Sequence, residues 1–157
     1  MKNLISAKVV LHTKHFLTNK SLYTLELEMP RILLAELNTH KILVRNCQSS
    51  RAVPIKSAIQ QLQSGNNFVP SYWGKKKAGM SASEENNELV SVGEVITTRE
   101  NTWLNAMNNA IAYAEAYDKA EYHKQIAGRL LEPFMMVRVL LSGTEWDNLF
   151  NLRVHSS

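Results

Sequence analysis

The sequence predicts an α+β domain with a central, mostly antiparallel sheet and packed helices. Residues 5–12 and 22–28 alternate apolar and polar side chains, as half-buried strands do. A mostly apolar run at 135–143 (MMVRVLLSG) is typical of a buried strand. Because these strands do not alternate regularly with helices, the order favours α+β over a doubly wound parallel fold.

Helical patterns fill most of the remaining chain. They share apolar residues at helical spacing and lie at 30–44, 54–63, 100–117 and 119–132. Pro30 at the first turn is preorganised for a helix, and Thr144 with Asp147 resembles a capping box that opens a last helix. The expected core positions of the 100–117 helix are Trp103, Met107, Ala110 and Ala114. Segment 64–99 has no periodic pattern, and such loops are often functional lids or binding loops.

Composition excludes several classes of protein. The 157 residues suit one domain, 1–157, with a sizeable core. Hydrophobic residues make up 45% and charged residues 20%, an ordinary globular balance. No apolar run approaches the ~18 residues that span a bilayer, and the start lacks a signal-peptide pattern. We therefore expect a cytoplasmic protein without a membrane partner.

The net charge and the number of cysteines limit which classes of ligand the protein can bind. The net charge of +4 is mildly basic and fits a phosphate-bearing small ligand. Without an RNA-binding motif, a zinc finger or a long basic run, we expect no nucleic-acid polymer. One cysteine excludes an internal disulfide and a multi-cysteine zinc site. His12 and His15 lack metal-ligand spacing with an acidic partner, so no metal site is expected.

Cys47 is a candidate nucleophile if a base lies near it in space. His40 lies on the same segment, but seven residues away, about two helical turns. The alternative interpretation is a small, semi-buried residue at a helix end. The sequence favours the second interpretation.

The turn that follows, with Ser49, Ser50 and Arg51, carries a different signal. A turn after a helix can present backbone N–H groups, hydroxyls and a fork-shaped cation to a phosphate. The alternative is a helix C-terminal turn in which Arg45 and Arg51 bind carbonyls. Arg129 shares a predicted helix face with Gln125; if buried it would need an anion, and the alternative is a solvated face. These patterns indicate a phosphate-bearing ligand and name no reaction.

The same residues resemble the flavin-dependent thymidylate synthases (the ThyX family). Their signature is Arg-His-Arg-x-x-Ser-x-Asn-Glu-x-Ser-x-Arg-Tyr, and residues 39–52 (THKILVRNCQSSRA) match it in register at His40, Asn46, Ser49 and Arg51. The departures resemble a divergent branch common in viruses, whose pattern this chain follows over residues 36–54. Further matches occur in order at Trp73-Gly74, His123-Lys124-Gln125, Arg129 to Phe134, Thr144-Glu145-Trp146 and Asn151-Leu152-Arg153.

The resemblance implies reductive methylation of deoxyuridylate (dUMP) to thymidylate (dTMP). Family members bind FAD, take the carbon from methylenetetrahydrofolate, and draw reducing equivalents from NAD(P)H. The cofactors do the hard chemistry, and the protein supplies position and electrostatics. The family also implies a homotetramer with sites at subunit interfaces, and a pyrimidine deoxynucleoside monophosphate as ligand.

The resemblance assigns roles residue by residue. The expected catalytic residues are Arg153, which would contact and help activate the pyrimidine, and Ser49. The expected nucleotide-binding residues are Glu36, Ser49, Ser50, Arg51, Arg129 and Arg153. The expected cofactor-binding residues are Thr39, His40, Lys41, Asn46, Ser142 and Thr144.

Departures from the signature leave two alternatives open. Cys47 replaces the signature glutamate, and Glu36 replaces a family glutamine. This altered pattern fits hydroxymethylation of dUMP, or action on deoxycytidylate, for modified viral DNA. Thr39 replaces a signature arginine, and relatives continue beyond the position of Arg153 with another helix. These two features fit a non-catalytic protein that binds flavin and nucleotide.

Overall fold

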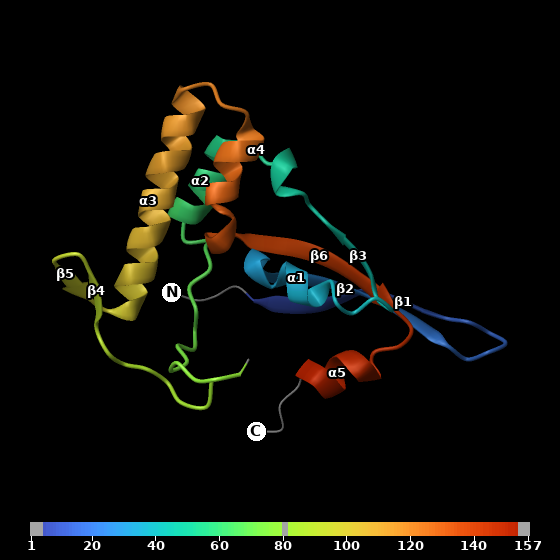
Figure 1. The fold of residues 1–157 in the computed structure, drawn as a ribbon. Helices are drawn as coiled ribbons and strands as arrows, with labels where there is room; N and C mark the ends of the chain where they lie inside the picture. Colours follow the sequence, from blue (N-terminus) through green and yellow to red (C-terminus); the bar gives the residue numbers. More distant parts are fainter. Residues whose placement is uncertain (1–4, 80–81, 154–157) are drawn as a thin grey trace.

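The computed structural model describes residues 5–79 and 82–153, apart from the side chain of Arg153. It confirms an α+β architecture with an antiparallel sheet (Figure 1). Four strands pair antiparallel in the order β1-β2-β6-β3. Their bounds are β1 Ser6–Lys14, β2 Ser21–Pro30, β3 Val44–Cys47 and β6 Met136–Gly143. The three strands predicted from the sequence are β1, β2 and β6.

The helix predicted over 30–44 is wrong beyond its first turns. A 3₁₀ turn, Arg31–Leu33, leads into α1, Leu34–Leu37, and the helix stops there. The hydroxyl of Thr39 donates to the carbonyl of Glu36 at 2.7 Å, and such local side-chain bonds compete with a continuing helix.

The rest of that stretch becomes β3, which pairs with β6 along the edge of the sheet. Val44 lies opposite Ser142, and Cys47 lies opposite Val139. The partner strand, β6, is far away in the sequence, so the spacing of the leucines could not predict that this segment pairs as a strand. Tertiary pairing therefore overrides local periodicity here.

The helices are α2 Ile55–Gln63, α3 Arg99–Lys119, α4 Lys124–Ala127 and α5 Asp147–Arg153. The first two confirm the predicted helices. The helix predicted over 119–132 is wrong at its start. Glu121 has a left-handed φ of 61°, which interrupts the helical backbone there. His123 then caps α4 by accepting a bond from the backbone N–H of Gln125 at 3.2 Å.

A short hairpin interrupts the segment expected to be irregular. Its strands are β4 Val90–Val92 and β5 Val95–Thr97, and Gly93 at the turn has a φ of 61°. Glycine adopts this conformation at no steric cost. Two-residue turns that begin with positive φ are the usual hairpin connections.

The main core lies between α2, α3 and the segment that contains α4. Ala114, Ala127 and Leu131 are 0% exposed, and Leu62 is 1% exposed. Met107 is buried as predicted, whereas Trp103 and Ala110 are partly buried and pack against this core. The periodic pattern of the longest helix therefore identified its buried face correctly.

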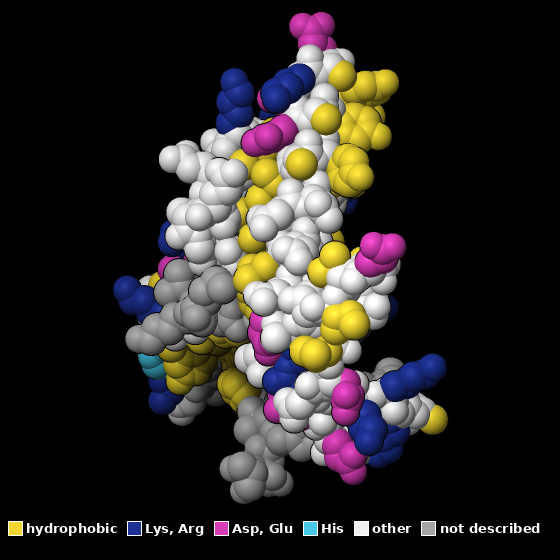
Figure 2. Space-filling model, turned by 90° about the vertical axis from the view of Figure 1, so that its left-hand side faces the viewer, with side chains coloured by type: hydrophobic (Ala, Val, Ile, Leu, Met, Phe, Trp, Pro, Cys, Tyr) yellow, Lys and Arg dark blue, Asp and Glu magenta, His cyan; other side chains and the backbone are white. Residues whose placement is uncertain are grey.

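The sheet is buried unevenly. Val139 and Leu141 of β6 are buried, whereas every residue of β1 is exposed. Figure 1 shows the β1–β2 hairpin extending away from the helices. Figure 2 views the molecule from the left-hand side of Figure 1, where α3 and the β4–β5 hairpin display exposed hydrophobic side chains. None of the helices in residues 5–79 and 82–153 is long and apolar enough to cross a bilayer.

Candidate functional site

β6 sorts the predicted site residues into two groups. Because β3 runs antiparallel to β6, the turn after β3 lies near the Met136 end and the chain before β3 lies near the Gly143 end. The first group, which we call the Met136-end group, comprises Ser49, Ser50, Arg51 and Arg129. The second, the Gly143-end group, comprises Thr39, His40, Lys41, Ser142 and Thr144.

The sequence predicted that this turn follows a helix. In the structure it instead leads from a strand, β3, into a helix, α2. Ser49 caps a 3₁₀ turn, Ser50–Ala52, and its Oγ accepts a bond from the backbone N–H of Arg51 at 3.3 Å. The side chains of Ser49 and Arg51 are exposed. The interpretation as a helix C-terminal turn is therefore wrong, and the hydroxyl and the guanidinium both face solvent.

Three side chains converge on the carboxylate of Glu132. Glu132 accepts a bond from the hydroxyl of Ser50, and its Oε2 lies 3.3 Å from a terminal nitrogen of Arg129. Its Oε1 lies 3.5 Å from Nε of Arg31. We call Glu132, Arg31, Ser50 and Arg129 the Glu132 cluster.

Exposure divides the two arginines of the Glu132 cluster. The side chain of Arg31 is 14% exposed, and that of Glu132 is 22% exposed. Arg31 also donates to the carbonyl of Gln48 at 3.3 Å, so it is fixed in place. Arg129 is 60% exposed, so the alternative of a solvated position is confirmed and the buried arginine is wrong. Arg31 is therefore the structural member of the pair, and Arg129 is the accessible one.

The charge balance of the Glu132 cluster favours an anion. Two guanidinium groups face one carboxylate, which leaves surplus positive charge. A cleft of about 510 Å³ adjoins them and is lined by Arg31, Asn38, Arg129 and Glu132 among others. Guanidinium forks match phosphate geometry and keep their charge at all working pH values. The arrangement is suited to a phosphate monoester.

Sequence reasoning missed Arg31 and Glu132. Each stands beside a proline, in Pro30-Arg31 and Glu132-Pro133, within otherwise apolar surroundings. A charge embedded in an apolar stretch needs a partner when it folds into the interior. That signal marks both residues as paired, although it does not identify them as each other's partners.

Several members of the Gly143-end group are already partnered within the chain. Ser142 and Thr24 share a hydrogen bond between their hydroxyls at 2.8 Å. His40 is 8% exposed, and its carbonyl accepts a bond from Arg45 at 3.0 Å. Lys41 and Thr144 are exposed. This end therefore presents a cation and a hydroxyl to solvent, while the histidine lies inside.

The other predicted residues occupy separate places. Asn46 is exposed on β3, opposite Leu140, and Glu36 is exposed on α1. Arg153 ends α5, and its side chain lies outside the described residues. Figure 1 shows α5 well apart from α2 and α4.

Cys47 lies on β3 opposite the buried Val139, and its side chain is half-buried. The predicted position at a helix end is wrong, but the semi-buried environment is as predicted. Within residues 5–79 and 82–153, no three histidine, cysteine, aspartate or glutamate side chains gather in a way that would hold a metal ion.

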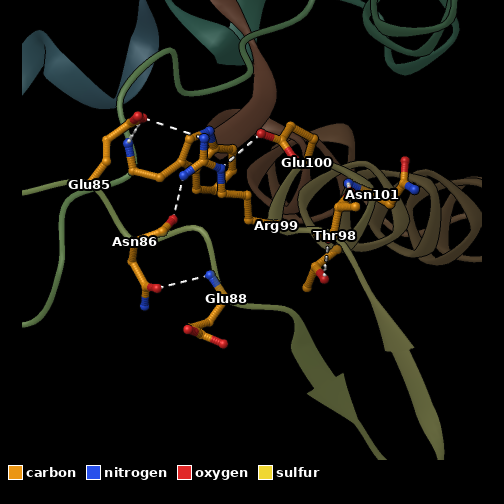
Figure 3. Close-up of polar contacts among 9 residues, drawn as sticks. Glu85, Asn86, Glu88, Thr98, Arg99, Glu100 and Asn101 are labelled. Carbon is orange, nitrogen blue, oxygen red and sulfur yellow. Dashed lines mark hydrogen bonds and ion pairs between the residues drawn. The ribbon is translucent and has the colours of Figure 1, made fainter.

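Another arginine, Arg99, holds part of the 64–99 segment, which was expected to be a lid or a binding loop. Arg99 lies 2.9 Å from Oε1 of Glu100 and 3.4 Å from Oε1 of Glu85, and it donates to the carbonyl of Asn86 (Figure 3). Its guanidinium also lies 5.8 Å from the ring centroid of Trp73. We call these five residues the Arg99 network. It ties the loop before β4 to the first turn of α3.

The hydrogen bond from Arg99 is the main reason that the pKa of Glu100 is lowered. A backbone hydrogen bond and the positive charge of Arg99 lower it further. Thr98 caps the same helix by accepting a bond from the N–H of Asn101 at 3.2 Å. The start of α3 is thus held by both a cap and an ion pair.

No protein-family model matches the chain, and no curated protein matches it.

Proposed function

We propose that this chain is a flavin-dependent thymidylate synthase-like enzyme with a ThyX-like fold. It methylates dUMP reductively to dTMP with methylenetetrahydrofolate and NAD(P)H. The observation that supports this most is the Glu132 cluster. In it, Ser50 and Arg129, which the signature resemblance assigns to the nucleotide, reach the same carboxylate from distant parts of the sequence.

The phosphate of dUMP is bound at the Met136 end in this proposal. Arg129 and Arg51 are exposed and can turn their forks toward a dianion. Glu132 positions Arg129 before the ligand arrives, which lowers the entropic cost of binding. The hydroxyl of Ser49 adds a donor beside Arg51.

FAD is assigned to the Gly143-end group together with Asn46. Lys41, Thr144 and Asn46 are exposed donors whose chemistry suits phosphate and ring-carbonyl acceptors. Asn46 lines a cavity of about 200 Å³, which is too small to enclose a dinucleotide. These residues fit part of a flavin site that a second subunit completes. Bound and reduced, the flavin supplies the hydride.

The proposal includes a homotetramer whose subunits share sites. Along β1, Val9, Val10 and Leu11 are 54%, 46% and 49% exposed, and at the hairpin tip Phe16 is 83% exposed. A long edge strand with this much apolar exposure usually pairs or is covered. A second subunit would also offer an Arg153 to the turn of the first.

The decisive experiment starts from the absorbance spectrum of purified protein loaded with FAD. Retained flavin absorbance, altered by dUMP, is expected. Turnover with dUMP, methylenetetrahydrofolate and NADPH should then give dTMP by mass spectrometry, and light scattering should give a tetramer. A protein that retains no FAD would contradict the flavin assignment. A product one oxygen heavier, or reaction of deoxycytidylate alone, would instead identify the modified-base activity.

A further inference from the structure

An aromatic cleft lies between the start of α3 and the loop that precedes β4. Its volume is about 500 Å³, which is within the range of small-ligand sites. Three of the residues that line it carry aromatic rings: Tyr72, Trp73 and Trp103. None of the residues assigned above to the nucleotide or the flavin lines this cleft. A ligand bound here would therefore be separate from dUMP and FAD.

Two indole rings form perpendicular walls of the cleft. The ring centroids of Trp73 and Trp103 lie 6.2 Å apart, and the ring planes meet at 79°. Trp103 is held in place, because its Nε1–H donates to the carbonyl of Phe68 at 2.8 Å. Tyr72 is 52% exposed, so a ligand can reach its ring from solvent. Several aromatic faces around one cleft favour an organic cation, since the negative face of each ring attracts positive charge.

Arg99 shows that this cleft already holds one cation against an indole ring. Its guanidinium lies 5.8 Å from the ring centroid of Trp73. The carboxylates of Glu85 and Glu100 lie 3.4 Å and 2.9 Å from its nitrogens. Because two carboxylates balance this guanidinium, Arg99 leaves no surplus positive charge to repel a second cation.

Glu88 supplies an unpaired negative charge. It is the other charged residue among the described residues that line the cleft. Its backbone N–H donates to Oδ1 of Asn86 at 3.0 Å. Within residues 5–79 and 82–153, however, no hydrogen bond or ion pair engages its carboxylate (Figure 3). The lysines at 75–77 belong to the same loop, but none of them lines the cleft. The charge that remains available to a ligand is therefore negative.

We propose that this cleft binds a small alkylammonium cation, of which the trimethylammonium group is the simplest probe. The methyl groups of such a cation pack against the rings, and its charge is attracted by the ring faces and by Glu88. A neutral ligand of the same shape gains only the packing, and an anion is repelled by Glu88. The nucleotide, flavin, folate and nicotinamide ligands of the proposed function all carry net negative charge. The cation site therefore goes beyond that function and belongs to none of its ligands.

The test is an NMR titration of the ¹⁵N-labelled full-length protein with choline and with 3,3-dimethylbutan-1-ol. The alcohol has the shape of choline, but carbon replaces the charged nitrogen. We expect choline to bind about tenfold tighter, the combined effect of cation–π attraction and one carboxylate. Equal affinities for the two compounds, or binding of neither, overturn the proposal.

The three tryptophans of the chain report where choline binds. The indole N–H signals of Trp73 and Trp103 should move during the titration. Trp146 lies outside the cleft, where its Nε1–H donates to the carbonyl of Gly143 at 3.0 Å, so its signal should stay in place. Equal shifts of all three signals would mean that choline acts on the whole surface, and the site would be overturned.

Two variants and two matched controls locate the binding further. Glu88→Gln should weaken choline about fivefold and leave the alcohol unchanged, because the shape is kept and the charge is lost. Tyr72→Leu should weaken choline about two- to fivefold, the contribution of one exposed ring. Glu94→Gln and Tyr113→Leu change exposed residues of the same types outside the cleft, and they should have no effect. Unaltered choline affinity in both cleft variants would overturn the site.

Two further measurements keep this test separate from the proposed function. The ratio of the choline and alcohol affinities in the unmodified protein decides the matter if a variant fails to fold. Glu88→Gln should retain FAD and bind dUMP as the unmodified protein does. Selective choline binding by a protein that retains no flavin would support the cation site and contradict the flavin assignment, and the reverse result would do the opposite.

Discussion

The Glu132 cluster and the Arg99 network use the same chemical groups in opposite proportions. In the first, one carboxylate faces two guanidinium groups and a hydroxyl. In the second, one guanidinium faces two carboxylates, a backbone carbonyl and an indole ring. The first has surplus positive charge, and the second has surplus negative charge.

The difference teaches how an arginine that binds a ligand differs from one that holds a loop. Every side of Arg99 already meets a partner, and its side chain is 20% exposed. Arg129 has one carboxylate partner and is 60% exposed. A phosphate would complete the arrangement around Arg129 in the Glu132 cluster and would be repelled by the carboxylates of the Arg99 network. The predictions below separate the two arrangements.

The largest effect is expected from Arg31→Met, which removes the buried arginine of the Glu132 cluster. Glu132 would lose its less exposed partner, and the carbonyl of Gln48 would lose a donor. Losing a partner of a buried ion pair costs about 3–5 kcal/mol, and partial exposure reduces the expected loss of unfolding free energy to about 2–3 kcal/mol. Urea denaturation measures this loss. A change below about 0.5 kcal/mol, typical of surface sites, would show that Arg31 is not structural.

Next in size is the effect of Arg129→Ala on dUMP affinity. Losing a charge-assisted bond to the phosphate costs about 1.5–3 kcal/mol, or about 10–150-fold in the dissociation constant. Its exposed ion pair contributes only about 0–1 kcal/mol to folding, so the protein should remain folded. Calorimetric titration with dUMP measures the affinity.

The matched control for that variant is Arg99→Ala. It removes the same side chain from the network with surplus negative charge, and the dUMP affinity should stay within about twofold. Equal losses in the two variants would show that overall charge, and not the Glu132 cluster, governs binding.

A smaller effect is expected from Arg99→Ala on the loop before β4. The variant frees Glu85 and the carbonyl of Asn86, so the loop should open more often. Exposed or partly exposed ion pairs contribute about 0.2–1 kcal/mol each, so we expect about a two- to fivefold rise in limited proteolysis at residues 70–89. Arg129→Ala should leave that rate unchanged. An unaltered rate in Arg99→Ala would show that Arg99 does not hold the loop.

Local patterns predicted the parts of this fold whose stability is local. The core face of α3 follows from residues such as Met107 and Ala114, which repeat at helical spacing within one element. β3 did not follow, because Val44–Cys47 becomes a strand only through pairing with β6. The β4–β5 hairpin carried a usable signal, since Gly93 stands between two β-branched runs.

The candidate site divides in the same way. Ser49, Ser50 and Arg51 were found because they are contiguous in the sequence. The Glu132 cluster was not found, because Arg31 and Glu132 lie far apart along the chain and meet only when two 3₁₀ turns, Arg31–Leu33 and Glu132–Phe134, pack together. A single sequence carries no signal for such a pairing.

The smallest effect concerns the titration of Glu100. The hydrogen bond and charge of Arg99 lower the pKa of Glu100 in the folded protein. Because the folded-state pKa is depressed, the contribution of this pair is present above the unfolded-state pKa and is lost as the pH falls through the folded-state pKa. Side-chain carboxyl NMR across an acid titration measures the midpoint. In Arg99→Ala the midpoint should rise toward the ordinary glutamate value, whereas Arg129→Ala should leave it in place. Identical midpoints in the native protein and in Arg99→Ala would mean that Arg99 does not donate a hydrogen bond to Glu100 in solution. Arg99 would then not be fully partnered, and it could no longer be contrasted with the accessible Arg129.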